Sequence, residues 1–372
     1  MHPQAQFCQN NDCPARGQIG KGNITVHSKK KQRYRCKVCG RTFTAGKGTV
    51  FFGMKKNAEL VVIVITLLSY GCPIPAIVAA FGLDVRTVRA WLKKAGQHCQ
   101  GVHEHFLEQQ ALNLEHVQAD EIKVKTQSGW LWMAMAMMVS TRLWLGGAVS
   151  AKRNLALISE LVAQIRSAAL CRKLLLSVDG LKSYVKAFQK AFRSPLRTGK
   201  LGRPKMIAWQ EIVIVQVVKK KTAGQFSVQR RIVQGCQEVV DRLLQSSQGG
   251  GVINTAFIER LNATFRQRLS ILARRTRNLA RKSDTLHVGM FLLGCVYNFC
   301  TFHKSLRLPL YIGERSRKWV HRTPAIAVGW TDHLWTVKEL LVFKVPPARW
   351  SPPVRRGRPS KETLSLIQEW CS

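Results

Sequence analysis

The hydrophobic positions near residue 60 recur with the period of an α-helix, and the same period continues beyond residue 90. The pattern predicts helices at 58–69, 75–81 and 85–94. Gly82 permits a tight turn before the third helix, and Asp84 is a natural N-cap for it. Apolar residues form the inner face of this helix, whereas its outer face is polar: Arg86, Thr87, Arg89 and Lys93. This arrangement is typical of a helix-turn-helix whose last helix enters the major groove of DNA, and the alternative is a generic helical hairpin.

From about residue 115 the apolar pattern changes to that of β-strands. Three apolar runs predict an antiparallel meander at 116–124, 129–140 and 143–151. The elements expected after it are a helix, a buried strand, a helix, another apolar strand and a helix, at 155–170, 173–180, 181–192, 211–220 and 237–247. Three antiparallel strands followed by a parallel strand and helices predict a mixed α/β layer.

Four cysteines stand as two pairs in the basic, turn-rich N-terminal segment. Four residues separate Cys8 from Cys13, and two separate Cys36 from Cys39. Each pair has the spacing of a zinc knuckle, and short strands between the pairs would bring the knuckles together as a zinc ribbon. Four thiolates leave zinc no open position, so a structural role is predicted. The alternative is a set of unrelated buried or free thiols.

The charge of the chain indicates its class of partner. The 59 Lys and Arg residues outnumber the 20 Asp and Glu residues, which gives a net charge of +39. Such an excess predicts a polyanionic partner, with nucleic acid first and an anionic membrane surface second. The longest apolar runs are shorter than the roughly 20 residues that span a bilayer, and the N-terminus does not resemble a signal peptide. The cytoplasm is therefore the expected location, and the odd count of 11 cysteines favours reduced thiols with some metal binding.

Three of the few acidic residues stand where a carboxylate needs an explanation. Asp120 lies inside the first predicted strand, Asp179 ends the fourth, and Glu259 lies on a helix predicted from about residue 255. A carboxylate inside a strand is costly unless a positive group meets it. If the three converge at one end of the sheet, their oxygens suit Mg²⁺ or Mn²⁺ and in-line displacement at phosphorus. The alternative is a solvated Glu–Arg pair and an ordinary strand-to-helix turn.

Glu259 stands among arginines and lysines. Asn262 and Arg266 share its face of the predicted helix. The basic neighbours would hold DNA phosphates while the carboxylate binds the metal, which explains why one acid stands in so basic a segment.

The order of these features resembles that of DDE transposases from small bacterial and archaeal insertion sequences, especially the group typified by insertion sequence one. The resemblance covers residues from about Cys8 to Leu341 and rests on the zinc ribbon, the helix-turn-helix, "QADE", "SVDG" and "FIERLNATFRQRL". The last of these is the most specific. The resemblance implies a ribonuclease H-like catalytic domain, a divalent metal, and cutting and joining at the ends of an element.

The resemblance also implies roles for particular residues. Asp120, Asp179 and Glu259 match the three catalytic metal ligands, and Arg266 matches the basic residue two helical turns after the glutamate. Glu121 adjoins Asp120, so the first assignment could shift by one residue. Strand geometry predicts that only one of the two faces the site, and Asp120 is preferred.

Four regions are predicted: a zinc ribbon, a helix-turn-helix, a ribonuclease H-like catalytic domain and a basic C-terminal extension, at 1–50, 55–100, 112–310 and 311–372. The predicted function is a DNA transposase that cleaves and transfers strands at the ends of an insertion sequence. The alternatives are a DNA-binding regulator without catalysis, a nuclease of the same fold, and a decayed copy that binds without moving. Metal-dependent cleavage or joining distinguishes an enzyme from a regulator.

The predicted partner is double-stranded DNA, both at the element ends and at the target, with no membrane partner. Two ends must be paired, so a homodimer or larger synaptic complex is expected, and the location would be nucleoid-associated. The stretch "VRRGRPSK" resembles an AT-hook, in which Arg356, Gly357, Arg358 and Pro359 suit a narrow A·T minor groove. The favoured alternative is a basic linker before a closing helix capped by Ser360.

Overall fold

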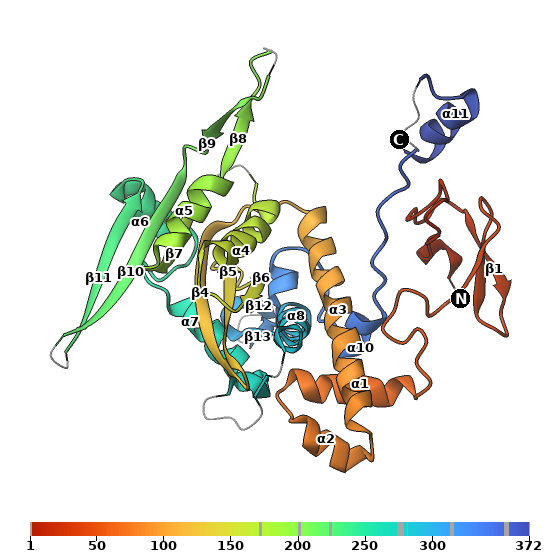
Figure 1. The fold of residues 1–372 in the computed structure, drawn as a ribbon, viewed down its shortest axis with the longest axis horizontal. Coiled ribbons are helices and arrows are strands. Elements are labelled where there is room, and N and C mark those ends of the chain that lie inside the picture. Colours follow the sequence, from red (N-terminus) through yellow and green to blue (C-terminus); the bar gives the residue numbers. More distant parts are fainter. Residues whose placement is uncertain are drawn as a thin grey trace. The chain divides into compact units, whose positions relative to one another are not determined.

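A computed structural model describes residues 2–170, 173–199, 202–222, 225–273, 279–280, 282–312, 316–352 and 357–371. The chain forms two compact units (Figure 1). The first combines Met1–Lys55 with Val342–Ser372, and the second is Lys56–Leu341. Within the described ranges, no helix has the length and apolar content needed to cross a membrane.

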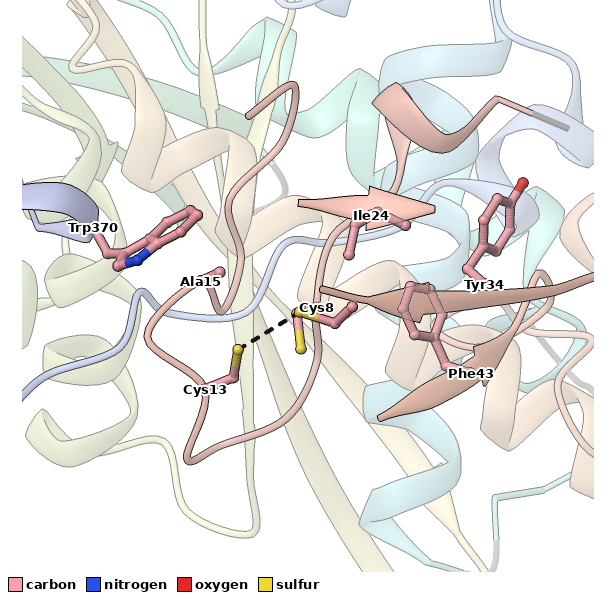
Figure 2. Close-up of a cluster of buried hydrophobic side chains, with 8 residues drawn as sticks. Cys8, Cys13, Ala15, Ile24, Tyr34, Phe43 and Trp370 are labelled. Atoms are coloured by element: carbon pink, nitrogen blue, oxygen red, sulfur yellow. Dashed lines mark hydrogen bonds between the residues drawn. The ribbon is translucent and has the colours of Figure 1, made fainter. Parts of the chain in front are cut away.

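The first unit is built on a small antiparallel sheet next to a cysteine cluster. Its strands are β1 (Ile24–Ser28), β2 (Arg33–Cys36) and β3 (Thr42–Thr44), in the order β1-β2-β3, and a short 3-10 helix, η1 (Pro3–Ala5), precedes them. Figure 2 shows its buried cluster, which includes Ile24, Tyr34 and Phe43 from the strands.

A distant segment of the chain completes this core. Trp370, at the end of α11 (Lys361–Trp370), is 8% exposed and packs in the same cluster. The side-chain amide of Gln18 donates to the carbonyl of Trp370 at 2.8 Å. Ser360 caps α11 by accepting from the backbone N–H of Thr363, as the sequence predicted. The proposed hook residue Arg356 lies outside the described residues.

The second unit begins with three helices, α1 (Ala58–Ser69), α2 (Ile74–Phe81) and α3 (Val85–Gln109). Gly82 adopts a left-handed conformation with φ +58°, which ends α2, and Asp84 caps α3 by accepting from two backbone N–H groups. The predicted end of the third helix at residue 94 is wrong.

The physical reason for the longer α3 is that its buried face continues past residue 94. Ala95, Cys99 and Val102 extend the apolar stripe, and α3 packs against α8 (Ser283–Cys300). A Cβ at Gly96 would lie 2.3 Å from the carbonyl oxygen of Val288, so this glycine serves helix contact and does not end the helix.

The centre of the second unit is a six-stranded mixed sheet in the order β11-β10-β7-β4-β5-β6. The strands are β4 (Glu115–Thr126), β5 (Gly129–Met138), β6 (Trp144–Ser150), β7 (Leu174–Asp179), β10 (Ile212–Thr222) and β11 (Gln225–Gln234). β4, β5 and β6 are antiparallel neighbours, β7 is parallel to both β4 and β10, and β11 is antiparallel to β10. The predicted mixed α/β layer is confirmed, although β11 and α8 were not predicted.

Helices cover both faces of the sheet (Figure 1). A Cβ at Gly146 of β6 would meet Gln164 of α4 (Leu155–Ala168), and one at Gly147 would meet Met290 of α8. Neighbouring strand residues point to opposite faces, so α4 and α8 lie on opposite sides. The other helices are α5 (Lys182–Ala191), α6 (Gln237–Ser246) and α7 (Ala256–Arg268). Helix α5 packs on α4, whereas α7 packs on β4 and β5.

The remaining described elements are short. They are the hairpins β8 (Arg193–Leu196) with β9 (Lys205–Ala208) and β12 (Leu308–Ile312) with β13 (Ser316–Val320), the 3-10 turns η2 (Ser270–Leu272) and η3 (Lys304–Leu306), and the helices α9 (Pro324–Ala327) and α10 (Val337–Val342).

Candidate functional site

The four N-terminal cysteines form one compact cluster. Their sulfur atoms all lie within 4.8 Å of one another, with Cys8 and Cys39 at 3.6 Å and Cys13 and Cys36 at 3.8 Å. A tetrahedron of Zn–S bonds of about 2.3 Å has edges of about 3.8 Å, so the sulfurs stand at the spacing of a zinc site. Burial raises the pKa of Cys8 to about 12, and clustered thiolates therefore need a cation to offset their charge. The predicted four-cysteine cluster is confirmed as a group able to hold a metal.

A second cluster lies where the pairing between the two central parallel strands stops. β4 pairs with β7 only as far as Gln118 and Ser177, so the edge of β4 is open beyond this point. Asp120 and Glu121 follow on β4, and Asp179 is the last residue of β7. Oxygens from the three carboxylates lie within 4.8 Å of one another. The expectation that only one of Asp120 and Glu121 faces the site is wrong, because both reach the end of β7 around this free edge.

Arg153, between β6 and α4, bridges two of these acids. Its Nη2 atom donates to Glu121 Oε2 at 2.9 Å and to Asp179 Oδ2 at 2.6 Å. The side chain of Glu121 is 0% exposed, and its Oε1 atom has no partner among the described residues. Burial, with the negative charge of Asp179, raises the pKa of Glu121 to about 7 although Arg153 opposes the shift. The cluster therefore contains a buried acceptor that no donor among the described residues satisfies.

Asp120 is held from the helix above it. Asn262 Nδ2 donates to Asp120 Oδ2 at 2.8 Å, while Asn262 Oδ1 is buried without a partner in the described part of the chain. Burial raises the pKa of Asp120 to about 6, and the charges of Asp179 and Glu259 act in the same direction. The three carboxylates, one of them with an orphaned oxygen, and the orphaned oxygen of Asn262 form a donor set of oxygen alone, which fits Mg²⁺ or Mn²⁺.

Gln118 explains why α7 begins beside Asp120. Its Oε1 atom accepts from the backbone N–H groups of Phe257 and Ile258, both at 3.1 Å, and its Nε2 atom donates to the carbonyl of Asn254. The first turn of α7 is thereby fixed to the buried part of β4. Gln118 and Asp120 project from the same face of the strand, so the amide that orients the helix also positions it above the acid.

Glu259 lies on this first turn but outside the cluster of three acids. Its Oε1 atom accepts from Lys219 Nζ of β10 at 2.5 Å and from Thr255 Oγ1 at 2.7 Å. Burial raises its pKa, but the bonds from Lys219 and Thr255 outweigh that effect, and the net shift is downward. Arg266 is half-buried on the same helix. The structure thus brings Asp120 and Asp179 together, adds Glu121, and leaves Glu259 paired with a lysine at the margin.

The predicted DNA-reading residues lie at the start of α3. Arg86 and Arg89 are exposed, Thr87 is half-buried, and Lys93 pairs with Asp284 at 3.2 Å. Both partners of this pair are more than half exposed, so the bond costs little to exchange for a phosphate. DNA contact by these residues stays a prediction.

Sequence reasoning missed Arg153 and Lys219 because a chain with 59 basic residues offers no signal that distinguishes them. Arg153 and Lys219 reach the acids because of the order of the strands in the sheet, and the pattern of a single helix or strand does not contain that order.

A scan against models of protein families and a search of curated proteins found no match to this chain.

Proposed function

We propose that this chain is a DNA transposase of the DDE class, in which the acidic cluster of the second unit cleaves and joins DNA strands with a divalent metal. The observation that carries the proposal is the convergence of Asp120, Glu121 and Asp179 at the free edge of β4, with Glu259 on the adjoining helix. Clustered carboxylates with orphaned oxygen neighbours need a cation, and a net charge of +39 needs a polyanion.

The sheet supports a ribonuclease H-like assignment for this domain. A meander of three antiparallel strands is followed by two strands parallel to its first strand. Asp179 ends one of the two central strands, and Asp120 and Glu121 lie midway along the other. Ligands of α/β sheets are held beyond the carboxyl ends of parallel strands, where Asp179 stands.

The roles of the residues follow from their positions. Asp120, Asp179 and either Glu121 or Glu259 would hold the metal, which when bound supplies Lewis-acid activation for displacement at phosphorus. Asn262 orients Asp120, and Lys219 keeps Glu259 charged. Arg153, Lys219 and Arg266 carry the positive charge that would hold the scissile phosphate against the acids.

The other regions supply recognition in this proposal. The four-cysteine cluster would bind one structural Zn²⁺ as a zinc ribbon, and α2 and α3 would act as a helix-turn-helix that presents Arg86 and Arg89 to the ends of the element. Two ends require a homodimer or larger complex, at the nucleoid in the cytoplasm. A DNA-binding regulator would share these parts but would have no need of three converging acids.

The test is strand cleavage and joining on DNA taken from either side of the coding sequence, with Mg²⁺ or Mn²⁺. Wild-type protein should nick and join it, whereas Asp179→Asn should lose activity by on the order of a thousandfold or more and keep its DNA affinity. The matched control is Asp241→Asn, an exposed aspartate on α6 that should leave activity unchanged. Binding without any metal-dependent cleavage by wild type would favour the regulator, and cleavage without joining would favour a nuclease.

A further inference from the structure

Two tryptophans on β5 form an open platform next to the acidic cluster. Trp130 is 50% exposed, and Trp132 is half-buried beside it on the same face of the strand. In the antiparallel pairing, Lys125 lies opposite Trp130 and Lys123 opposite Trp132. Both lysines are exposed. This combination is here called the Trp130 platform (Trp130, Trp132, Lys123 and Lys125). Neighbouring apolar side chains that are open to solvent and rimmed by polar residues mark interaction sites.

The platform is continuous with the acids. Lys123 and Lys125 follow Glu121 at intervals of two on β4, so all three project from one face of the sheet. Arg153, which bridges Glu121 and Asp179, also lies over the Trp132 ring, with its Cζ atom 5.1 Å from the ring centroid. At about 3.4 Å per strand residue, the four steps from Glu121 to Lys125 span roughly 14 Å, room for a few nucleotides.

The chemistry of the platform fits one kind of ligand. The Nζ atom of Lys123 lies 4.1 Å from the centroid of Trp130 and 5.8 Å from that of Trp132, so each ring has a cation beside it. Aromatic rings stack on bases whatever their sequence, and lysines between them follow the phosphates. A base pair inside a duplex hides its faces, so only an unpaired base offers the surface that an exposed indole needs.

We propose that the Trp130 platform binds the unpaired bases of a DNA strand end and thereby guides that strand towards the acidic cluster. The proposal rests on the proposed function for the identity of the polyanion as DNA. A cation over an indole also stabilises a hairpin by itself. If Trp130 had only that structural role, its replacement would change the stability of the fold. It would not change the relative affinities for single-stranded and blunt DNA ends.

The test uses the full chain, a buffer without Mg²⁺ or Mn²⁺ to prevent cleavage, and a DNA hairpin with a three-nucleotide single-stranded end that contains 2-aminopurine. Wild-type protein should change the 2-aminopurine fluorescence and bind this DNA more tightly than the blunt hairpin at the same salt. Trp130→Thr should weaken binding of the single-stranded end by roughly tenfold and change blunt-end binding less than twofold. Trp130→Phe, which keeps an aromatic face, should restore most of the lost affinity.

The matched control is Trp319→Ala on the hairpin β12–β13. Trp319 also has a cation over its ring, since Arg307 Cζ lies 3.9 Å from the centroid, but no acid cluster adjoins it among the described residues. Its removal should leave both affinities unchanged. Equal losses on single-stranded and blunt ends in Trp130→Thr, or no fluorescence change with wild type, would overturn the proposal.

The two proposals fail separately. Asp179→Asn should abolish metal-dependent cleavage and keep the preference for single-stranded ends. If wild type never cleaves DNA but the preference depends on Trp130, the platform stands and the proposed transposase function falls. If wild type cleaves DNA and the preference does not depend on Trp130, the platform alone falls.

Discussion

The two candidate metal clusters of this protein are built in opposite ways. The four thiol ligands come from a short stretch, Cys8 to Cys39, and their sulfurs already stand at tetrahedral spacing. The carboxylates come from Asp120, Glu121 and Asp179 on two strands, and Arg153 partly neutralises them. A closed thiolate site fits structural zinc, whereas oxygen ligands at an open strand edge leave positions for a substrate. One cluster is suited to maintain a fold, and the other is suited to exchange its contacts during a reaction.

The largest expected effect is the loss of zinc from the four-cysteine cluster. Cys36→Ser should abolish stoichiometric zinc and unfold the first unit, because structural zinc sites supply about 10 kcal/mol of folding free energy. Metal analysis together with the emission of Trp370, buried in this core, would report both changes. Cys236→Ser, at an exposed cysteine outside the cluster, should keep zinc and fold. If Cys36→Ser kept both its zinc and its structure, the four-cysteine cluster would not be the structural site that distinguishes it from the acidic cluster.

Acid should weaken the second unit through a route that needs no metal. His103 on α3 is fully buried among aromatic rings, and burial lowers its pKa to about 4. Its folded pKa lies below the unfolded value of about 6.5, so its stabilising contribution is present above pH 6.5 and is lost as pH falls towards 4. The difference between the two pKa values corresponds to about 3 kcal/mol. Urea titrations between pH 7 and 4 should show the free energy of unfolding falling with pH. His103→Phe should make that fall smaller by about 3 kcal/mol.

A smaller expected effect concerns the acidic cluster alone and is a loss of folding free energy that Mn²⁺ reverses. Arg153→Ala leaves the buried Glu121 without its counter-ion and should cost about 2 kcal/mol of folding free energy, a value discounted because Arg153 is itself about one-third exposed. Added Mn²⁺ should recover this loss if the acids bind a cation. Thermal unfolding with and without Mn²⁺ would measure it. Arg349→Ala in the first unit is the control, and a loss that Mn²⁺ leaves unchanged would contradict a metal role for the acids.

The sequence was informative wherever local periodicity determines structure. The meander, the buried strand before Gly180 and α5 appear close to their predicted bounds, and α7 begins close to its predicted start, because apolar positions at two- or 3.6-residue intervals determine a strand or a helix. The cysteine spacing likewise predicted a cluster, since all four ligands lie within one small unit.

The site depends on information that local patterns lack. The length of α3 depends on its packing against α8, which needed Gly96 at the contact. Asp120 and Glu121 both reach the acidic cluster because the β4–β7 pairing stops before them. Lys219 lies beside Glu259 because β10 is the neighbour of β7 in the sheet. Strand order is a tertiary property, so no single-element prediction contained these contacts.

The contribution of Trp370 to the first unit has a consequence for biosynthesis. Residues 8–39 are made before the second unit, but the indole that closes their core is made more than 300 residues later in the numbering of the chain. The intervening 56–341 unit can complete its own core first, since domains fold as they emerge. The first unit therefore matures after the second, once Trp370 has been made. A prematurely ended chain would carry the acids and the cysteines yet lack the finished first unit, so truncation would impair that unit before it impaired the sheet.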